Sequence, residues 1–215
     1  QEVLGFGGAF TEASASVYQQ CTQEKKEEII KAYFNFEKGH GYSFCRTHIN
    51  SCDFSLDNYA YCETNGDSQL NNFSIEHDKT MLIPFSKDAL KKSAIPLNIL
   101  ASPWSPPDWM KTNGEMNNGG KLKDEYRDSW AHYFCKYGNA YENEGISIWG
   151  VSVQNEPAAK QVWDSCLYSG KEEKIFVRDF LGPTFTNNHL QDKKIVIWDH
   201  NRDIMVERAR SVLSD

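Results

Sequence analysis

The stretch Ile146–Pro157, I-S-I-W-G-V-S-V-Q-N-E-P, joins a run of β-branched and aromatic residues to an abrupt polar end. The run predicts a buried β-strand, because such residues pack well on a pleated, buried surface. Pro157 ends the strand, since proline cannot extend the ladder of a central strand. Asn155 and Glu156 are therefore expected at the carboxyl end of a buried strand, where barrels of alternating strands and helices carry their catalytic groups.

Two roles are open to Glu156. Adjacent strand residues point to opposite faces, so Asn155 and Glu156 can serve one site only if the backbone bends between them. A glutamate at this position could instead cap the next helix or pair with a surface cation. We favour catalysis, because the N-E-P sequence follows an unbroken buried strand.

The order of strand, polar exit and helix recurs along the chain. The glycine-rich stretch Gly5–Phe10 predicts close backbone packing at the first strand, and it lacks the Lys and Ser/Thr of a phosphate loop. Further strands are expected at Tyr42–Ile49, Ile95–Ser102 and Lys194–Trp198. Helices are expected at Thr22–Phe36 with Thr22 as N-cap, Lys79–Ser93 with an interruption near Pro84, Tyr126–Glu144, Glu172–Leu181 and Ile204–Leu213.

This alternation predicts an α/β fold with parallel strands joined by right-handed crossovers. Two architectures fit: an open doubly wound sheet, or a (β/α)8 barrel of which about five strands are present. A dinucleotide-binding open sheet needs a glycine fingerprint after its first strand, and this chain has none. Polar residues at every strand exit favour the barrel. No linker marks a second domain, so residues 1–215 are predicted to form part of one catalytic domain.

Polar or aromatic side chains follow each expected strand. Asn50–Asp53 follows the second strand and leads into Ser55–Ser74, a polar loop whose length is unusual unless it is functional. Trp104 and Trp109 lie in a proline-rich loop after the third strand. Prolines stiffen this loop, so the tryptophans could stack on a ligand. Alternatively they plug the core, an equally good interpretation for Trp109.

Composition excludes several classes of partner. The net charge of −7 argues against binding to nucleic acid, which requires a basic face. No segment is long and apolar enough for stable insertion into a membrane. Aromatic residues make up 13% of the chain, which suits either sugar stacking or a bulky core.

The six cysteines and six histidines show no metal-site spacing. There is no C-x-x-C, H-x-H or H-E-x-x-H, so no structural zinc is expected. Cysteine density is far below that of a disulfide-stapled domain, which predicts reduced thiols and favours a cytoplasmic protein. No signal peptide is seen, but the missing initiator methionine indicates a trimmed piece, which leaves secretion open.

Several motifs together resemble glycoside hydrolase family 30, the glucosylceramidase-type retaining β-glycosidases. They occur in the family's order and span most of the chain. The match looks closer to a bacterial member, because His200 and Asn201 differ from the animal lysosomal pattern. The matching segments are Gly5–Ala13 (G-F-G-G-A-F-T-E-A), Ser51–Ser55 (S-C-D-F-S), Ala101–Trp109 (A-S-P-W-S-P-P-D-W), Met110–Gly114 (M-K-T-N-G) and Val153–Pro157 (V-Q-N-E-P).

The resemblance implies a (β/α)8 barrel that hydrolyses β-linked sugars without a metal or organic cofactor. It implies that Glu156 is the acid/base and that Asn155 contacts the sugar 2-hydroxyl. Asp53 and Trp104 match positions that bind the sugar in the first subsite. Arg46 matches an arginine that supports the carboxylates from below.

One part of the family pattern is absent. The family's nucleophile is a glutamate after the seventh strand, whereas this sequence reaches only the fifth. Retaining hydrolysis needs two carboxyl groups about 5 Å apart. We therefore expect this chain to be inactive alone and the remainder of the barrel to come from a parent chain.

The substrate stays open at this point. Glucosylceramide is one candidate, β-1,6-glucan is a serious alternative, and β-xylosides are a weaker one. A non-catalytic carbohydrate-binding protein would keep Asp53 and Trp104 but not the carboxylate pair. A nucleotide-binding open sheet ranks last.

Overall fold

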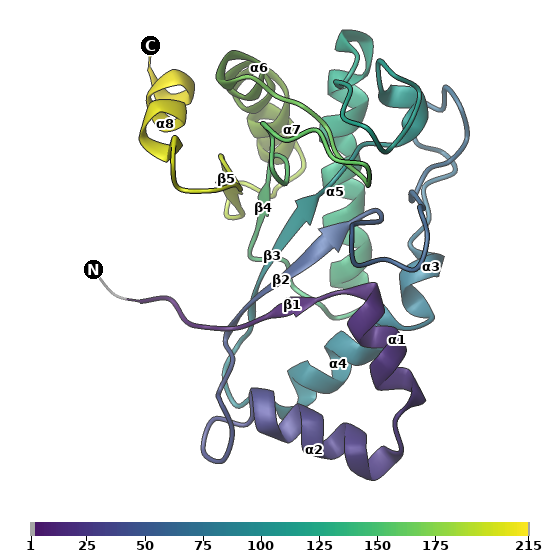
Figure 1. The fold of residues 1–215 in the computed structure, drawn as a ribbon, viewed down its shortest axis with the longest axis vertical. Coiled ribbons are helices and arrows are strands. Elements are labelled where there is room, and N and C mark those ends of the chain that lie inside the picture. The colour runs from purple at the N-terminus through teal and green to yellow at the C-terminus, as the bar shows by residue number, and fades with distance from the viewer. Residues whose placement is uncertain (1–2, 215) are drawn as a thin grey trace.

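Five parallel strands form one sheet in the order β1-β2-β3-β4-β5 in the computed structural model, which describes residues 3–214 (Figure 1). Gln1, Glu2 and Asp215 of the predicted domain lie outside the described residues. The strands are β1 (Ala9–Phe10), β2 (Phe44–Ile49), β3 (Asn98–Pro103), β4 (Gly150–Ser152) and β5 (Lys194–Val196).

The sequential strand order confirms the barrel-type architecture. A doubly wound sheet reverses its strand order at a switch point, and this sheet does not reverse. β2 and β3 pair in parallel from Phe44 opposite Asn98 to Ile49 opposite Pro103. Parallel pairing at every step brings the carboxyl ends of the strands to one edge of the sheet.

Helices follow the strands, as the sequence predicted. Near β1, helix α4 packs against α1 and α2, and near β5, helix α6 packs against α8 (Figure 1). The α-helices are α1 (Glu12–Gln20), α2 (Gln23–Phe34), α3 (Glu76–Lys79), α4 (Leu82–Lys92), α5 (Arg127–Asn143), α6 (Gly170–Ile175), α7 (Gly182–Asn187) and α8 (Met205–Leu213). Short 3-10 segments are η1 (Asp108–Met110) and η2 (Asp124–Tyr126), and η3 (Phe176–Leu181) is a π-helix.

Helix starts follow local capping chemistry. Thr22 caps α2 by accepting a hydrogen bond from the Lys25 amide, which confirms the predicted N-cap. Helix α1 was not predicted. It begins at a capping box between Thr11 and Ser14, with serine in the place where glutamate or glutamine gives the recognisable signature.

Two helix predictions were wrong in detail. The interruption expected near the start of Lys79–Ser93 occurs at Thr80 and Met81, between α3 and α4, and not at Pro84. Pro84 lies in the first turn of α4, where a missing N–H costs nothing. The helix expected to end at Leu181 continues to Asn187 through the π-helical segment η3. There the Gly182 amide bonds to the Val177 carbonyl, five residues back, and this change of register accommodates the proline that follows.

The strand predicted within Ile146–Pro157 is shorter than expected. Only Gly150–Ser152 pairs as β4, although two flanking backbone bonds extend it. The Trp149 amide bonds to the Ile99 carbonyl at 2.9 Å, and the Val153 amide bonds to the Val196 carbonyl at 3.0 Å. The segment is thus held between β3 and β5 up to the catalytic candidates.

The long loop after β2 is fixed by one buried carboxylate. Asp78 in α3 accepts hydrogen bonds from the Tyr59, Tyr61 and Tyr141 hydroxyls at 2.9, 2.6 and 2.6 Å. Tyr59 and Tyr61 belong to the loop, and Tyr141 belongs to α5. Because a buried carboxylate is stable only when its oxygens are satisfied, these bonds tie the loop firmly to the helix layer.

The sheet is open on both sides within the described range. β1 pairs only with β2, and β5 pairs only with β4. An apolar hollow of about 610 Å³ lies beside β1. Its apolar lining includes Phe10, Val17, Tyr33, Tyr42 and Phe54. No helix in the described part of the chain combines the length and the apolar character needed to cross a bilayer.

Residues 1–215 expressed alone are expected to self-associate, because open sheet edges and an apolar hollow are exposed to water. Size-exclusion chromatography with light scattering should show aggregates, with the full-length protein as the comparison. A stable monomer that unfolds in a single cooperative urea transition would contradict this expectation.

Candidate active site

The backbone after β4 is clamped between the ends of its two neighbours. The Asn155 amide donates to the Pro103 carbonyl at 2.8 Å, and the Glu156 amide donates to the Asp199 carbonyl at 2.9 Å. The exits of β3, β4 and β5 are therefore joined directly through the main chain. Asn155 and Glu156 stay in place although they lie beyond the paired strand.

Left-handed backbone conformations mark three of the strand exits. Asn50 after β2, Glu156 after β4 and Trp198 after β5 have φ values of 62°, 46° and 55°. Such conformations cost a non-glycine residue about 1–3 kcal/mol and concentrate at functional sites. At Glu156 this is the bend that the sequence requires if Asn155 and Glu156 are to serve one site.

Arg46 on β2 links the other exits. Its guanidinium donates to Asn155 Oδ1 at 2.8 Å, to Asp199 Oδ2 at 2.7 Å and to Ser102 Oγ at 3.0 Å. The resemblance implied that Arg46 supports the catalytic carboxylates; its side-chain contacts in the structure are with Asp199, Ser102 and the side-chain amide of Asn155. Because Arg46 engages the carbonyl end of that amide, the NH₂ end is turned away from it.

Trp104 and Asp53 are the remaining two of the five predicted site residues. The Arg46 guanidinium lies 4.4 Å from the centre of the Trp104 ring, and the indole is buried. The pKa of Asp53 is raised, mainly by burial and then by the charge of Glu156. Arg46 and a hydrogen bond with Trp104 act in the opposite direction on Asp53. All five predicted residues thus come together at one edge of the sheet.

Trp109 packs into the core, which is the second of the two roles that the sequence left open for it. Its indole N–H donates to the Cys62 carbonyl at 2.9 Å, and its ring meets Tyr126 edge-on at 4.9 Å. The side chain is only 5% exposed, so it supports the loop from within.

Two residues at the site received no role from the sequence. Asp199 pairs with Arg46, accepts from Ser102 Oγ at 2.8 Å and holds the Glu156 amide. The only sequence feature that points to Asp199 is its position just after an expected strand. Gln161 donates from Nε2 to Glu156 Oε2 at 3.3 Å, and nothing in the sequence of its loop singles it out.

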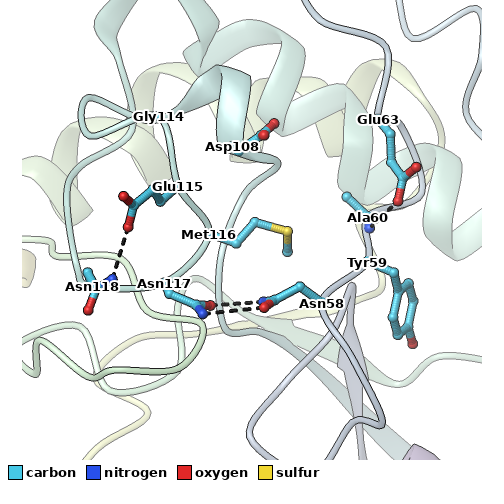
Figure 2. Close-up of a pocket in the computed structure, with 10 residues that line it drawn as sticks. All are labelled: Asn58, Tyr59, Ala60, Glu63, Asp108, Gly114, Glu115, Met116, Asn117 and Asn118. Atoms are coloured by element: carbon cyan, nitrogen blue, oxygen red, sulfur yellow. Dashed lines mark hydrogen bonds between the residues drawn. The ribbon is translucent and has the colours of Figure 1, made fainter.

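A separate pocket of about 500 Å³ lies between the loops that follow β2 and β3 (Figure 2). Asn58 and Asn117 join its two sides through reciprocal amide hydrogen bonds of 2.8 and 3.3 Å. Glu63, Asp108 and Glu115 also line it, and none of the five predicted site residues does. Among residues 3–214, no cluster of three or more His, Cys, Asp or Glu side chains is arranged to hold a metal ion.

Comparison with known proteins places these features in a family. The model of the glycosyl hydrolase family 30 TIM-barrel domain matches residues 3–215. The lysosomal acid glucosylceramidase of Mus musculus is 37% identical over 224 residues, which cover 100% of this chain and 43% of that protein. This chain thus spans less than half the length of that relative.

Two solved structures superpose closely on this chain. The crystal structure of SrfJ from Salmonella typhimurium superposes with a TM-score of 0.96 at 40% identity, covering 100% of this chain and 48% of that one. The endo-β1,6-glucanase BT3312 gives a TM-score of 0.90 at 29% identity, covering 99% of this chain and 48% of that one.

Replacing Arg46 by Met in the full-length protein should lower the free energy of unfolding by about 1.5–3 kcal/mol, because charge-assisted hydrogen bonds between strand exits are lost. Urea unfolding measures this change. The matched control is Arg178→Met, which removes an exposed ion pair with Asp179 and should change stability little. Equal effects at the two positions would show that Arg46 does not tie the exits together.

Replacing Asp53 by Asn should stabilise the full-length protein at neutral pH. The raised pKa of Asp53 means that its ionisation opposes folding, so wild-type stability falls as pH rises through the carboxyl range. The gain should therefore be larger at about pH 7 than at about pH 3. Thermal unfolding across this range tests the sign, with the exposed Asp203→Asn as control. A gain that grows toward low pH would contradict the assignment.

Proposed function

Because this chain belongs to glycosyl hydrolase family 30, we propose that the protein containing it is a retaining β-glycosidase with Glu156 as acid/base. The observation that carries the proposal is the position of Glu156. Its backbone is held in a left-handed bend at a strand exit, and its charge is felt by Asp53. A sugar-binding site without chemistry has no need to hold a strained carboxylate there.

The first step of the proposed reaction is glycosyl transfer to the enzyme. Glu156 gives its proton to the glycosidic oxygen as the bond to the anomeric carbon breaks. A second carboxylate attacks that carbon from the opposite face and forms a covalent glycosyl-enzyme. Glu156 leaves this step ionised.

The second step is hydrolysis of that intermediate. Glu156, now a base, takes a proton from water, and the water oxygen attacks the anomeric carbon while the bond to the nucleophile breaks. The enzyme returns to its starting protonation state. Each substitution inverts the configuration of the anomeric carbon, so the two together leave the sugar with its original configuration.

The nucleophile is proposed to lie outside this chain. Asp199 is a poor candidate, because its Oδ2 already accepts from Arg46 at 2.7 Å and from Ser102 at 2.8 Å. Asp53 is assigned to the sugar hydroxyls in this scheme, so it is not free to act as the nucleophile. A glutamate from a later strand of the full-length barrel fills the role.

The remaining residues form the sugar subsite in this scheme. Asn155 presents its amide to the 2-hydroxyl, a contact that strengthens in the transition state of retaining glycosidases. Asp53 accepts hydrogen bonds from other hydroxyls, and Trp104 borders the ring. Arg46 keeps Asn155 oriented, since it fixes the carbonyl end of the amide.

The proposed substrate is a β-glucoside. The mouse relative is named a glucosylceramidase, and the structural relative BT3312 is named an endo-β1,6-glucanase. Glucosylceramide and β-1,6-glucan are therefore the two leading substrates, with β-xylosides third. A non-catalytic carbohydrate-binding protein is the alternative from another class.

Full-length wild type is expected to cleave aryl β-glucosides, and Glu156→Gln should lose about 10²–10⁴-fold in kcat/KM, the usual contribution of general acid–base catalysis. The loss should be largest for poor leaving groups, which depend on protonation. A panel of β-glucosides, β-xylosides and β-1,6-glucan measures both the substrate class and the loss.

The exposed Glu125→Gln is the matched carboxylate control. Normal turnover by Glu156→Gln would refute the acid/base assignment. Sugar binding without turnover of any glycoside by wild type would favour the carbohydrate-binding alternative.

A further inference from the structure

Gln161 makes the side-chain contact to Glu156 described above, through the loop that follows β4. Its Nε2 donates to Glu156 Oε2 at 3.3 Å, and the Ala159 amide donates to the Glu156 carbonyl at 2.9 Å. The chain therefore turns back immediately after Glu156. This turn brings the amide of Gln161 to the carboxyl group from within the same loop.

The backbone of Gln161 is itself held firmly. Ser165 Oγ lies 3.1 Å from both the amide nitrogen and the carbonyl oxygen of Gln161. The Asn118 amide also donates to the Gln161 carbonyl at 2.9 Å, and the Gly119 amide donates to Ser165 Oγ at 2.9 Å. The loop after β3 thus braces the loop that carries Gln161.

A buried lysine joins the same two loops. Lys111 has no exposed surface, and its ammonium donates to the Ser165 carbonyl and to the Met116 carbonyl, the latter at 2.9 Å. Burial lowers the pKa of Lys111 to about 8. A buried ammonium is costly unless it is hydrogen-bonded, so its presence here indicates that the connection between the loops matters.

We infer that Gln161 is a positioning residue that orients the Glu156 carboxyl group, with Lys111 and Ser165 holding Gln161 in place. The inference rests on the proposed role of Glu156 as acid/base. An N–H donor stabilises the ionised carboxylate more than the neutral acid. Gln161 holds Glu156 Oε2 in one orientation, which matters because the same group must first give a proton and then take one.

The other charges near Glu156 come from neighbouring strand exits. Asp53 after β2 repels its anion, while Arg46 on β2 and Asp199 after β5 form an ion pair beside it. Gln161 is neutral, so replacing it leaves these charges unchanged. A change in the titration of Glu156 can then be assigned to the lost hydrogen bond.

The test is the pH dependence of kcat/KM for an aryl β-glucoside in the full-length protein. In Gln161→Leu the basic limb, which reports deprotonation of the acid, should move up by about 1–2 pH units, the effect of one hydrogen bond to a charged group. In Gln161→Lys the added cation favours the carboxylate, so the limb should move down. Val162→Ala, an exposed neighbour in the same loop, is the control and should leave the limb in place.

A second measurement does not depend on turnover. Nuclear magnetic resonance titration of ¹³Cδ-labelled glutamate, with the Glu156 signal assigned from Glu156→Gln, should show the same opposite shifts in Gln161→Leu and Gln161→Lys. If the Glu156 signal shifts in this way but wild type cleaves no glycoside, the inference is supported and the proposed function is overturned. If wild type cleaves the glucoside but the Glu156 titration is unchanged in both Gln161 variants, the inference alone is overturned.

A double variant tests whether Lys111 acts on Glu156 through Gln161. Lys111→Met should move the basic limb in the same direction as Gln161→Leu, and the two changes together should give less than the sum of the single effects, because both act through one contact. Additive shifts would show that Lys111 does not act through Gln161. If Lys111→Met does not fold, the Gln161 variants decide the main inference.

Discussion

A single guanidinium on β2 joins the ends of β3, β4 and β5. Arg46 on β2 reaches Ser102 on β3, Asn155 after β4 and Asp199 after β5. A half-buried arginine is tolerated at low cost only with a carboxylate partner, and Asp199 supplies it. The strand ends are therefore fixed relative to each other before any ligand binds. Such preorganisation is what a site needs if its polar groups are to stabilise a transition state.

The backbone strain at this edge is offset by dense hydrogen bonding. The side chain of left-handed Asn50 donates from Nδ2 to the Ser105 carbonyl at 3.0 Å and accepts at Oδ1 from the Tyr61 amide at 3.1 Å. Left-handed Trp198 donates its amide to buried Glu173 at 3.0 Å. Glu156 is held through Asp199 in the same way. Each bend is thus held by hydrogen bonds to neighbouring loops and helices.

The fold could be predicted from the sequence because its signals are local. The apolar run before Asn155, the Thr22 cap and the polar strand exits each report directly on nearby backbone. Contacts that depend on several loops left no such signal. Gln161 meets Glu156 only because the chain turns at Ala159, and the π-helix η3 appears only when Gly182 changes its bonding partner. The roles of Asp53 and Trp104 came from family resemblance, and the geometry brings these residues to Glu156 without testing those roles.

The electrostatics of this edge constrain where the proposed nucleophile can lie. Asp199 is paired with Arg46, and the pKa of Asp53 is raised by burial and by the charge of Glu156. A further carboxylate beside Asp53 would raise its pKa again, so the favourable position faces Glu156 from the side away from β2. β1 and β5 are the strands with an unpaired side in the described range, and a closed barrel places its remaining strands between them. In the proposed reaction, a carboxylate at the exit of such a strand would serve as the nucleophile, at the separation of about 5 Å from Glu156 that double displacement requires.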